Sequence, residues 1–248
     1  MMRLIASFGR FLLFVLDVFR KAESRSMIYR LVIKEISELG LKSILFVTFV
    51  SLFMGGVVTL QTVANMDGSW MPRYLIGFAT RDAIILEFSP TIISLLLAGK
   101  LGSNIASSIG TMRVTEQIDA LEVMGVNPIS YLVRPKIIAM MFFNPILIGI
   151  SMIFGLLGGL LAGVLSGDCT IAEFVSGLQY SFIPFKAVYA LIKTILFAFV
   201  IASISSFYGF YTKGGALEVG RSSTYAVVYS SVIIIVLNYV ITKLLLGS

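Results

Sequence analysis

Several stretches of the sequence carry no charge over a length that would cross a lipid bilayer, and residues 44–64 and 222–242 are two of them. In helical form such a stretch reaches about 30 Å, which matches the hydrocarbon core of a membrane. Hydrophobic residues make up 58% of the chain and charged residues 13%, against about 25% charged in soluble domains. We therefore expect an all-α protein that crosses the membrane several times.

The residue types also exclude most catalytic chemistry. The 248 residues include no histidine, which removes imidazole bases, Ser-His triads and the common zinc sites. Cys169 is the only cysteine, so neither an intrachain disulfide nor a thiolate cluster can form. The formal charge of +6 fits basic flanks of membrane helices better than nucleic-acid binding. We expect no catalytic residue, no metal site and no cofactor in this chain.

Residues 1–21 are expected to form an amphipathic helix, and we do not interpret them as a signal peptide. The polar face would carry Arg3, Ser7, Arg10, Asp17 and Lys21, and the apolar face Leu4, Ile5, Phe8, Phe11, Leu12, Val15 and Phe19. This distribution is typical of a helix lying in the membrane interface, and equally of a helix packing on the protein's own bundle. The two readings are compatible. Residues 22–42 are expected to follow as a charged helical link, which completes an arm of residues 1–42.

Five membrane spans are expected within a single domain of residues 1–248, at residues 43–65, 83–110, 137–165, 187–210 and 224–246. Small residues recur at every fourth position in the second and third spans, which lets helices approach closely. These residues are Gly102, Ala106 and Gly110 in the second span, and Gly155, Gly159 and Gly163 in the third. We expect both sets to pack helices within one protomer.

The distribution of lysine and arginine predicts the orientation. With five spans and a cytoplasmic N-terminus, the inner segments hold fourteen of these residues and the outer segments four. Cytoplasmic loops carry the excess of positive charge, so this count favours an N-terminus inside the cell. Most of the excess comes from the arm of residues 1–42.

The loop after the second span is expected to contain a short amphipathic helix at residues 115–125. Thr115 is suited to cap its start, and Gly125 with the following Asn-Pro pair is suited to end it. The acids Glu116, Asp119 and Glu122 recur by threes, while Ile118, Leu121, Val123 and Met124 provide apolar surface. Such a short helix is marginal alone in water and needs a docking surface. Three interpretations remain: insertion into a partner protein, a divalent-cation site, or a solvated loop.

Residues 110–128 also carry a resemblance to a known family. The run Thr-Glu-Gln-Ile-Asp-Ala-Leu-Glu-Val-Met-Gly-Val-Asn-Pro at 115–128 resembles the signature of the MlaE-type permease family. Members are membrane subunits of bacterial ABC lipid transporters that work with MCE-domain proteins. Residues 97–106, with Lys100 where the family usually has arginine, and residues 214–228 resemble two further segments of that family. The likeness covers nearly the whole chain.

The resemblance implies a homodimer in a bacterial inner membrane that moves phospholipid to or from an MCE-domain partner. The short cytoplasmic helix would be a coupling helix seated in a groove of a separate ATPase, which alone binds ATP and magnesium. The coupling residues would be Glu116, Gln117, Asp119, Leu121, Glu122, Met124 and Gly125. Neither the direction of transport nor the presence of a small regulatory subunit follows from the sequence, and the dimer-forming helix faces do not either.

Glu87 and Lys193 lie inside the expected spans, where ionisable residues are costly. Glu87 in the second span and Lys193 in the fourth both fall toward the outer half of the membrane, so a cross-helix interaction is geometrically allowed. The pair would either fix the helix register or form a polar spot in a cavity for a lipid headgroup. The family often has arginine where Leu86 stands, and Arg73 or Arg81 are the nearby candidates for that charge.

The first span is the other candidate wall of a lipid cavity. By resemblance this segment lines the dimer cavity that holds acyl chains, so Val57, Val58, Leu60 and Gln61 face lipid or cavity, depending on the rotation of the helix. For Gln61 a hydrogen bond to a neighbouring helix is the alternative. The Gly-Gly pair at 55–56 is expected to loosen the packing there.

Two other classes of function compete with a permease. An intramembrane enzyme of lipid metabolism would need a paired-acid metal motif or a nucleophile with a base, and the acid cluster of the sequence lies outside the spans. A secondary transporter driven by protonation of Glu87 would be expected to show an internal repeat, and none is evident.

Overall fold

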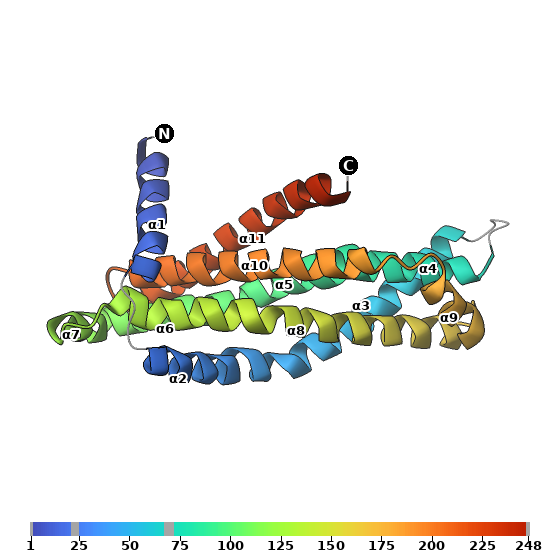
Figure 1. The fold of residues 1–248 in the computed structure, drawn as a ribbon, viewed down its shortest axis with the longest axis horizontal. Coiled ribbons are helices and arrows are strands. Elements are labelled where there is room, and N and C mark those ends of the chain that lie inside the picture. The colour runs from blue at the N-terminus through green and yellow to red at the C-terminus, as the bar shows by residue number, and fades with distance from the viewer. Residues whose placement is uncertain (1, 21–24, 67–71, 247–248) are drawn as a thin grey trace.

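The computed structural model describes residues 2–20, 25–66 and 72–246, and every regular element in these ranges is helical (Figure 1). Five helices are long and apolar enough to cross a membrane. The expected all-α membrane architecture is therefore confirmed. The long helices lie side by side in an elongated bundle.

All five candidate spans begin earlier than the sequence predicted. The first is Ser26–Met66, made of α2 (Arg25–Glu35), η1 (Ile36–Leu41) and α3 (Lys42–Met66). The second is Tyr74–Val114, made of α4 (Tyr74–Ala83), η2 (Ile84–Ile92), α5 (Ile93–Leu97), η3 (Ala98–Gly102) and α6 (Ser103–Val114). The third is α8 (Pro128–Leu165). The η segments are wider, π-helical turns within otherwise continuous helices.

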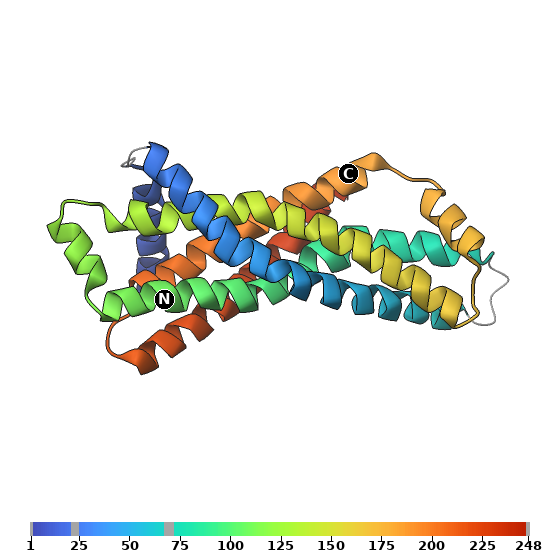
Figure 2. The same cartoon turned by 90° about the horizontal axis from the view of Figure 1, so that it is seen from below.

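The remaining elements are two spans and three shorter helices. The spans are α10 (Pro184–Phe210) and α11 (Ala216–Leu246). The shorter helices are α1 (Met2–Arg20), α7 (Gln117–Val123) and α9 (Ile171–Gln179). Figures 1 and 2 show α7 at one end of the bundle and α9 at the opposite end. The predicted link is helical from Arg25 onward, and residues 21–24, which include Lys21, lie outside the described residues.

Helix α1 lies across the bundle axis near the α7 end (Figure 1). Phe14 and Val18 are fully buried, and the Phe14 ring packs edge-on against Phe207 of α10 at 5.6 Å between centroids. Leu13 and Leu16 remain exposed. The helix therefore divides its apolar surface between the bundle and the surroundings, as both sequence readings allowed. The side chains of residues 2–8, including Arg3 and Phe8, lie outside the described residues.

Helices α3 and α8 touch backbone to backbone. A Cβ atom on Gly55 would lie 1.8 Å from the Gly155 carbonyl oxygen, and one on Gly158 would lie 1.9 Å from the Leu52 carbonyl oxygen. The expectation that Gly55 loosens the packing is therefore wrong, because its missing side chain is what admits α8. The expected packing role of Gly155, Gly159 and Gly163 within one protomer is confirmed.

The small residues of the second span pack against α10 and α11. A Cβ atom on Gly102 would lie 2.9 Å from Ser205 Oγ, and one on Gly209 would lie 2.7 Å from the Ala106 carbonyl oxygen. At Gly110 the neighbours are Thr212 and Val219. This prediction is confirmed as well, and close contact between these helices fixes the position of α6.

Helix α9 was not predicted from the sequence, and it packs closely against α4 at the end of the bundle opposite α7 (Figure 1). Its start is a capping box: the Thr170 hydroxyl accepts from the Glu173 backbone N–H, and the Glu173 carboxylate accepts from the Thr170 N–H at 2.8 Å. The motif Thr-x-x-Glu before apolar residues was the available signal. At the other end, the buried Arg81 donates to the carbonyl oxygens of Leu178 and Tyr180 at 2.7 and 2.9 Å.

Candidate functional site

The structure brings Glu87 and Lys193 together inside the bundle. Lys193 Nζ lies 3.2 Å from Glu87 Oε1, and the same nitrogen donates to the Leu86 carbonyl oxygen at 3.1 Å. It also stands 5.2 Å from the centre of the Tyr189 ring. A buried ammonium is tolerated only where acceptors surround it, and these three contacts supply them.

Lys193 reaches the backbone of η2 beside a proline. Pro90, inside η2, lies four residues after Leu86 and has no backbone N–H. The Leu86 carbonyl oxygen therefore cannot accept an α-helical hydrogen bond from residue 90, and it accepts one from Lys193 Nζ. A proline in one span thus lies beside the backbone acceptor of a lysine from another span.

Two further residues hold the second oxygen of Glu87. Asn238 of α11 donates from Nδ2 to Glu87 Oε2 at 3.0 Å, and the Thr91 hydroxyl lies 3.1 Å from the same oxygen. The sequence analysis singled out neither residue. The available signal was Asn238 itself, the only amide in the uncharged stretch 222–242.

The two charges differ in exposure. The Lys193 side chain is 0% exposed, whereas the Glu87 side chain is 44% exposed. A ligand at the surface of the protomer therefore meets the carboxylate and not the ammonium. The Glu87 carboxylate is thus an accessible hydrogen-bond acceptor, and the positive charge of Lys193 is buried behind it.

The arginines proposed to stand in for Leu86 are engaged elsewhere. Arg81 binds the end of α9 and forms an ion pair with Asp82 at 2.8 Å. Arg73 donates to the Asp168 carbonyl oxygen at 3.0 Å. Among the described residues, the positive charge beside Glu87 is Lys193, so the sequence expectation about these arginines is wrong.

Only some of the α3 residues predicted to line a lipid cavity are exposed. Val57, Leu60 and Gln61 are exposed, but Val58 is 4% exposed and packs inside the bundle. The prediction for Val58 is therefore wrong, because its position on the helix turns toward the packed side. Among the described residues of one protomer, no hydrogen bond joins the exposed Gln61 amide to a neighbouring helix.

An open apolar groove of about 290 Å³ runs between α3 and α8. Val57 and Leu60 line it from α3, and Leu161 and Leu165 line it from α8, above the small residues Gly56 and Gly158. Its lining contains neither Glu87 nor Lys193, so the structure does not bring the charged pair and the apolar groove to one cavity within a protomer.

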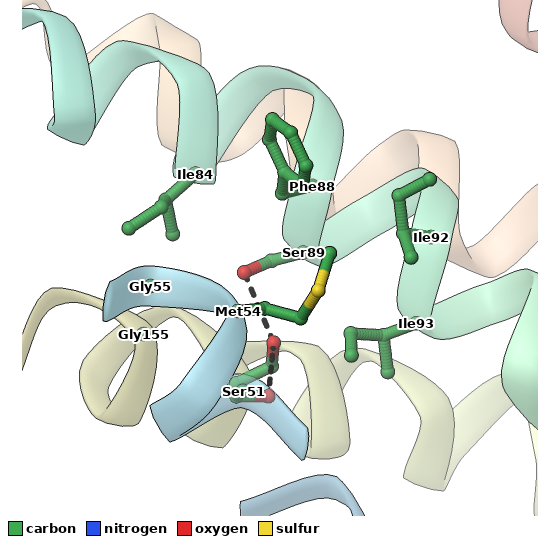
Figure 3. A pocket seen from close by; sticks show the side chains of 10 residues that line it. Ser51, Met54, Gly55, Ile84, Phe88, Ser89, Ile92, Ile93 and Gly155 are labelled. Carbon is green, nitrogen blue, oxygen red and sulfur yellow. Dashed lines mark hydrogen bonds between the residues drawn. The ribbon is translucent and has the colours of Figure 1, made fainter. Parts of the chain in front are cut away.

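A second pocket, between α3, η2 and α8, is a packing feature (Figure 3). Its hydroxyl groups form a chain, in which Ser51 donates to Ser151 at 2.8 Å and Ser151 donates to Ser89 at 3.0 Å. The space is about 10 Å³, roughly that of one water molecule, and cannot hold a lipid chain.

Helix α7 begins differently from the prediction. Glu116 precedes it in the left-handed conformation, at φ 59°, and makes no side-chain cap. The Thr115 hydroxyl donates backward to the Thr111 carbonyl oxygen at 2.8 Å, so the predicted Thr115 cap is wrong. The reason is that Thr115 still belongs to the last turn of α6, and the chain reverses at Glu116.

The end of α7 follows the prediction. Gly125 has φ 77°, and the Val126 N–H donates to the Leu121 carbonyl oxygen at 3.1 Å. Gly125 N–H donates to Glu122 in the same motif, which satisfies the last carbonyls of the helix. Asn127 then caps α8, since its Oδ1 accepts from two backbone N–H groups at the start of that helix.

One side of α7 is anchored and the other is exposed. Ile118 is fully buried in the main core, and Asp119 pairs with Arg113 of α6 at 2.5 Å. Val123 and Met124 are 89% and 68% exposed at the tip. Glu116, Gln117, Asp119, Glu122 and Gly125 are exposed too, and Leu121 is half-buried. The described residues contain no group of three histidines, cysteines, aspartates or glutamates placed to hold a metal ion.

Comparison with known proteins gives consistent matches. The family model described as Permease MlaE matches residues 32–244. A probable ABC transporter permease protein of Rickettsia bellii is 35% identical over 98% of this chain and 93% of its own length. One of Synechocystis is 35% identical over 86% of this chain and 81% of its own length. The intermembrane phospholipid transport system permease protein MlaE of Haemophilus influenzae is 28% identical over 89% of this chain and 84% of its own length.

Proposed function

Because this chain belongs to the MlaE permease family, we propose that it is the membrane subunit of an ABC transporter that moves phospholipid. In this proposal two copies form a homodimer in a bacterial inner membrane and exchange lipid with an MCE-domain protein outside. The observation that supports it most is the construction of α7, a short helix anchored at Ile118 with an apolar tip at Val123 and Met124.

The tip of α7 suits a groove in a separate ATPase. Exposed apolar side chains flanked by acids are better explained by a docking contact than by a solvated loop. The helix lies between α6 and α8, so movement of the ATPase would pass to two spans as rigid-body motion. ATP and magnesium belong to the partner in this proposal, and this subunit hydrolyses nothing. A small regulatory subunit is compatible with it and is not required.

The lipid would contact two surfaces of the protomer. Glu87 offers a half-exposed carboxylate to a headgroup, and Lys193 balances its charge from inside. Val57, Leu60 and Gln61 offer a largely apolar face on α3, where acyl chains replace lipid contacts at little cost. The relative from Haemophilus influenzae is named for intermembrane phospholipid transport, which supports a phospholipid as the substrate class.

The proposed orientation is supported by the distribution of positive charges and by the position of α7. A cytoplasmic N-terminus places α1 and α7 on the cytoplasmic side and α9 outside (Figures 1 and 2). An ATPase in the cytoplasm then reaches α7, and an MCE-domain partner reaches the opposite end of the bundle.

The test is affinity purification of the tagged protein in mild detergent, with identification of bound proteins and lipids. We expect an ATP-binding protein and phospholipid to copurify. Glu116→Lys and Met124→Asp should release the ATPase while the spans stay folded. Val175→Asp is the matched control for Met124→Asp. It places a carboxylate on the exposed apolar surface of α9, at the other end of the bundle, and should retain the ATPase.

The rival functions give different results in the same preparation. An intramembrane enzyme would turn over lipid as a purified single chain. A carrier driven by protonation of Glu87 would keep working when ATP is depleted. Isolation of a monomer without an ATP-binding partner would overturn the proposed function.

A further inference from the structure

Three residues close a ring of hydrogen bonds between η2 and α11. Asn238 Nδ2 donates to Glu87 Oε2 at 3.0 Å. Thr91 Oγ1 lies 3.1 Å from the same carboxylate oxygen and 3.2 Å from Asn238 Oδ1. Each oxygen of the Glu87 carboxylate therefore has a partner from a different span, since Lys193 of α10 holds Oε1.

Thr91 cannot serve both of its acceptors fully. Its hydroxyl carries one proton, which goes either to Glu87 or to Asn238 or is shared between them. Both acceptors stand within hydrogen-bond distance. When the Glu87 carboxylate engages another donor, Thr91 can turn to Asn238 and keep η2 joined to α11. The ring can thus release part of the carboxylate without losing the contact between helices.

A second polar contact holds α11 one helical turn farther on. Thr242 shares a hydrogen bond of 2.7 Å with Tyr189 of α10, and the Tyr189 ring lies beside Lys193. The neighbouring surface of α11 is apolar and exposed at Ile235, Val236 and Tyr239. Figure 1 shows the C-terminal half of α11 leaning away from α10.

These polar contacts matter because, in hydrocarbon, apolar contacts distinguish poorly between alternative positions of a helix. Lipid tails are as apolar as the side chains of α11, so polar contacts decide where this part of the helix stands. Asn238 is the residue that connects that position to Glu87. A shift of α11 would alter the orientation of the carboxylate, and a ligand on the carboxylate would alter the position of α11.

We propose that Asn238 and Thr91 are positioning residues for Glu87, and that Asn238 couples the position of α11 to headgroup binding. The inference rests on the proposed function, in which Glu87 contacts the headgroup. Holding both carboxylate oxygens from three spans orients the group before the lipid arrives, which reduces the entropy lost on binding.

The test is a mutant cycle on the purified, delipidated full-length protein in mild detergent. The probe is tritium-labelled palmitoyl-oleoyl phosphatidylethanolamine, and the readout is its dissociation constant. We expect Asn238→Leu to weaken binding about fivefold, a conservative figure for a hydrogen bond to a charged group. Thr91→Val should weaken binding to a smaller extent, and Thr91→Ser, which keeps the hydroxyl, should bind as the parent does.

The decisive measurement uses a double variant, Glu87→Ala with Lys193→Met, as the background. Both charges of the ion pair are absent from it. If Asn238 acts through Glu87, adding Asn238→Leu to this background leaves the dissociation constant unchanged. A further fivefold loss there would mean that Asn238 supports the helices independently, and would overturn the inference. If Asn238→Leu does not fold, the Thr91→Val and Thr91→Ser pair is measured against the same background.

Asn144→Leu is the matched control. Asn144 is a buried amide that ties α8 to α10 through the Thr194 carbonyl oxygen at 3.0 Å, away from the ring around Glu87. It should lower the melting temperature and leave lipid affinity unchanged. A background variant without Glu87 that binds lipid like the parent would overturn the headgroup site itself. That result is distinct from failure of the Asn238 step alone.

Discussion

Lys193 is fully buried, yet the carboxylate it pairs with at 3.2 Å, that of Glu87, is 44% exposed. The lysine cannot leave this position without losing its acceptors, because its other hydrogen bond goes to the Leu86 carbonyl next to Glu87 in the chain. The glutamate can turn part of its surface to a ligand and still neutralise the lysine. In this pair Lys193 is fixed in place, and Glu87 is accessible to a ligand.

This asymmetry predicts unequal costs for removing the two charges. Glu87→Ala leaves a buried ammonium without a counter-charge and should lower the free energy of unfolding by about 2 kcal/mol, less than the 3–5 kcal/mol of fully buried pairs. Glu87→Ala combined with Lys193→Met removes both charges and should recover much of that loss. Unfolding in mixed micelles measures both variants, and a double variant no more stable than Glu87→Ala would contradict the prediction.

The backbone contact of α3 with α8 predicts intolerance to a single methyl group. Gly55→Ala would place Cβ within 1.8 Å of the Gly155 carbonyl oxygen, so the helices must separate. We expect a loss of about 2 kcal/mol, in the range of overpacked cores. Gly149→Ala, in α8, is the matched control, because a Cβ atom there would meet no atom within 4 Å. Equal melting temperatures for the two variants would show that the helices are not in direct contact.

The backbone around α7 predicts two changes of opposite sign. Glu116 and Gly125 both have positive φ, at 59° and 77°. Glu116→Asn places a residue that tolerates this conformation and should slow protease cleavage between residues 110 and 128. Gly125→Ala adds a Cβ there, costs about 1 kcal/mol locally, and should speed cleavage. Timed limited proteolysis of the membrane-embedded protein checks both, and the same direction for both would refute the strain argument.

The capping box of α9 predicts a pH dependence at the end of the bundle opposite α7. The backbone N–H of Thr170, and after it the Thr170 hydroxyl, lower the pKa of Glu173 below its usual 4.5. A carboxyl with a lowered pKa stabilises the folded state fully above 4.5, and this contribution is lost as the pH falls through the lowered value. The protection factor for hydrogen exchange in the first turn of α9, which corrects for the slower intrinsic exchange at acidic pH, should therefore fall as the pH drops from neutral to below 4.5.

The control for this effect is Glu173→Gln, which keeps the side-chain length and removes the titrating group. Its first turn should be less protected at neutral pH and should not lose further protection on acidification. An unchanged acid response in Glu173→Gln would assign the effect to another group.

The helical spans could be predicted because the membrane simplifies the problem. Long uncharged stretches must be helical there, since no water satisfies the backbone, and this yields the five candidate spans found among the described residues. Gly155, Gly159 and Gly163 could be assigned to packing because their four-residue spacing puts them on one helix face. The end of α7 at Gly125 could be predicted from local turn chemistry.

Other features could not be predicted because they depend on helix rotation. Val58 was grouped with Val57 and Leu60, but adjacent residues point about 100° apart, and only packing decides which of them is buried. The start of α7 was misplaced because Thr115 bonds back into α6 rather than forward. Asn238 passed unnoticed since its partner lies 151 positions away in the sequence.

The sequence alone determined that this chain is a set of membrane helices with a short amphipathic helix between two of them, and the family to which it belongs. These properties reside in composition, local spacing and a contiguous motif, all of which are independent of how helices rotate and pair. Only the tertiary structure decided that Lys193 is sealed behind Glu87, that Asn238 and Thr91 complete the ring, and that Arg81 serves α9 instead. Each of these depends on which face a helix turns toward its neighbour, and that choice is made by packing in three dimensions.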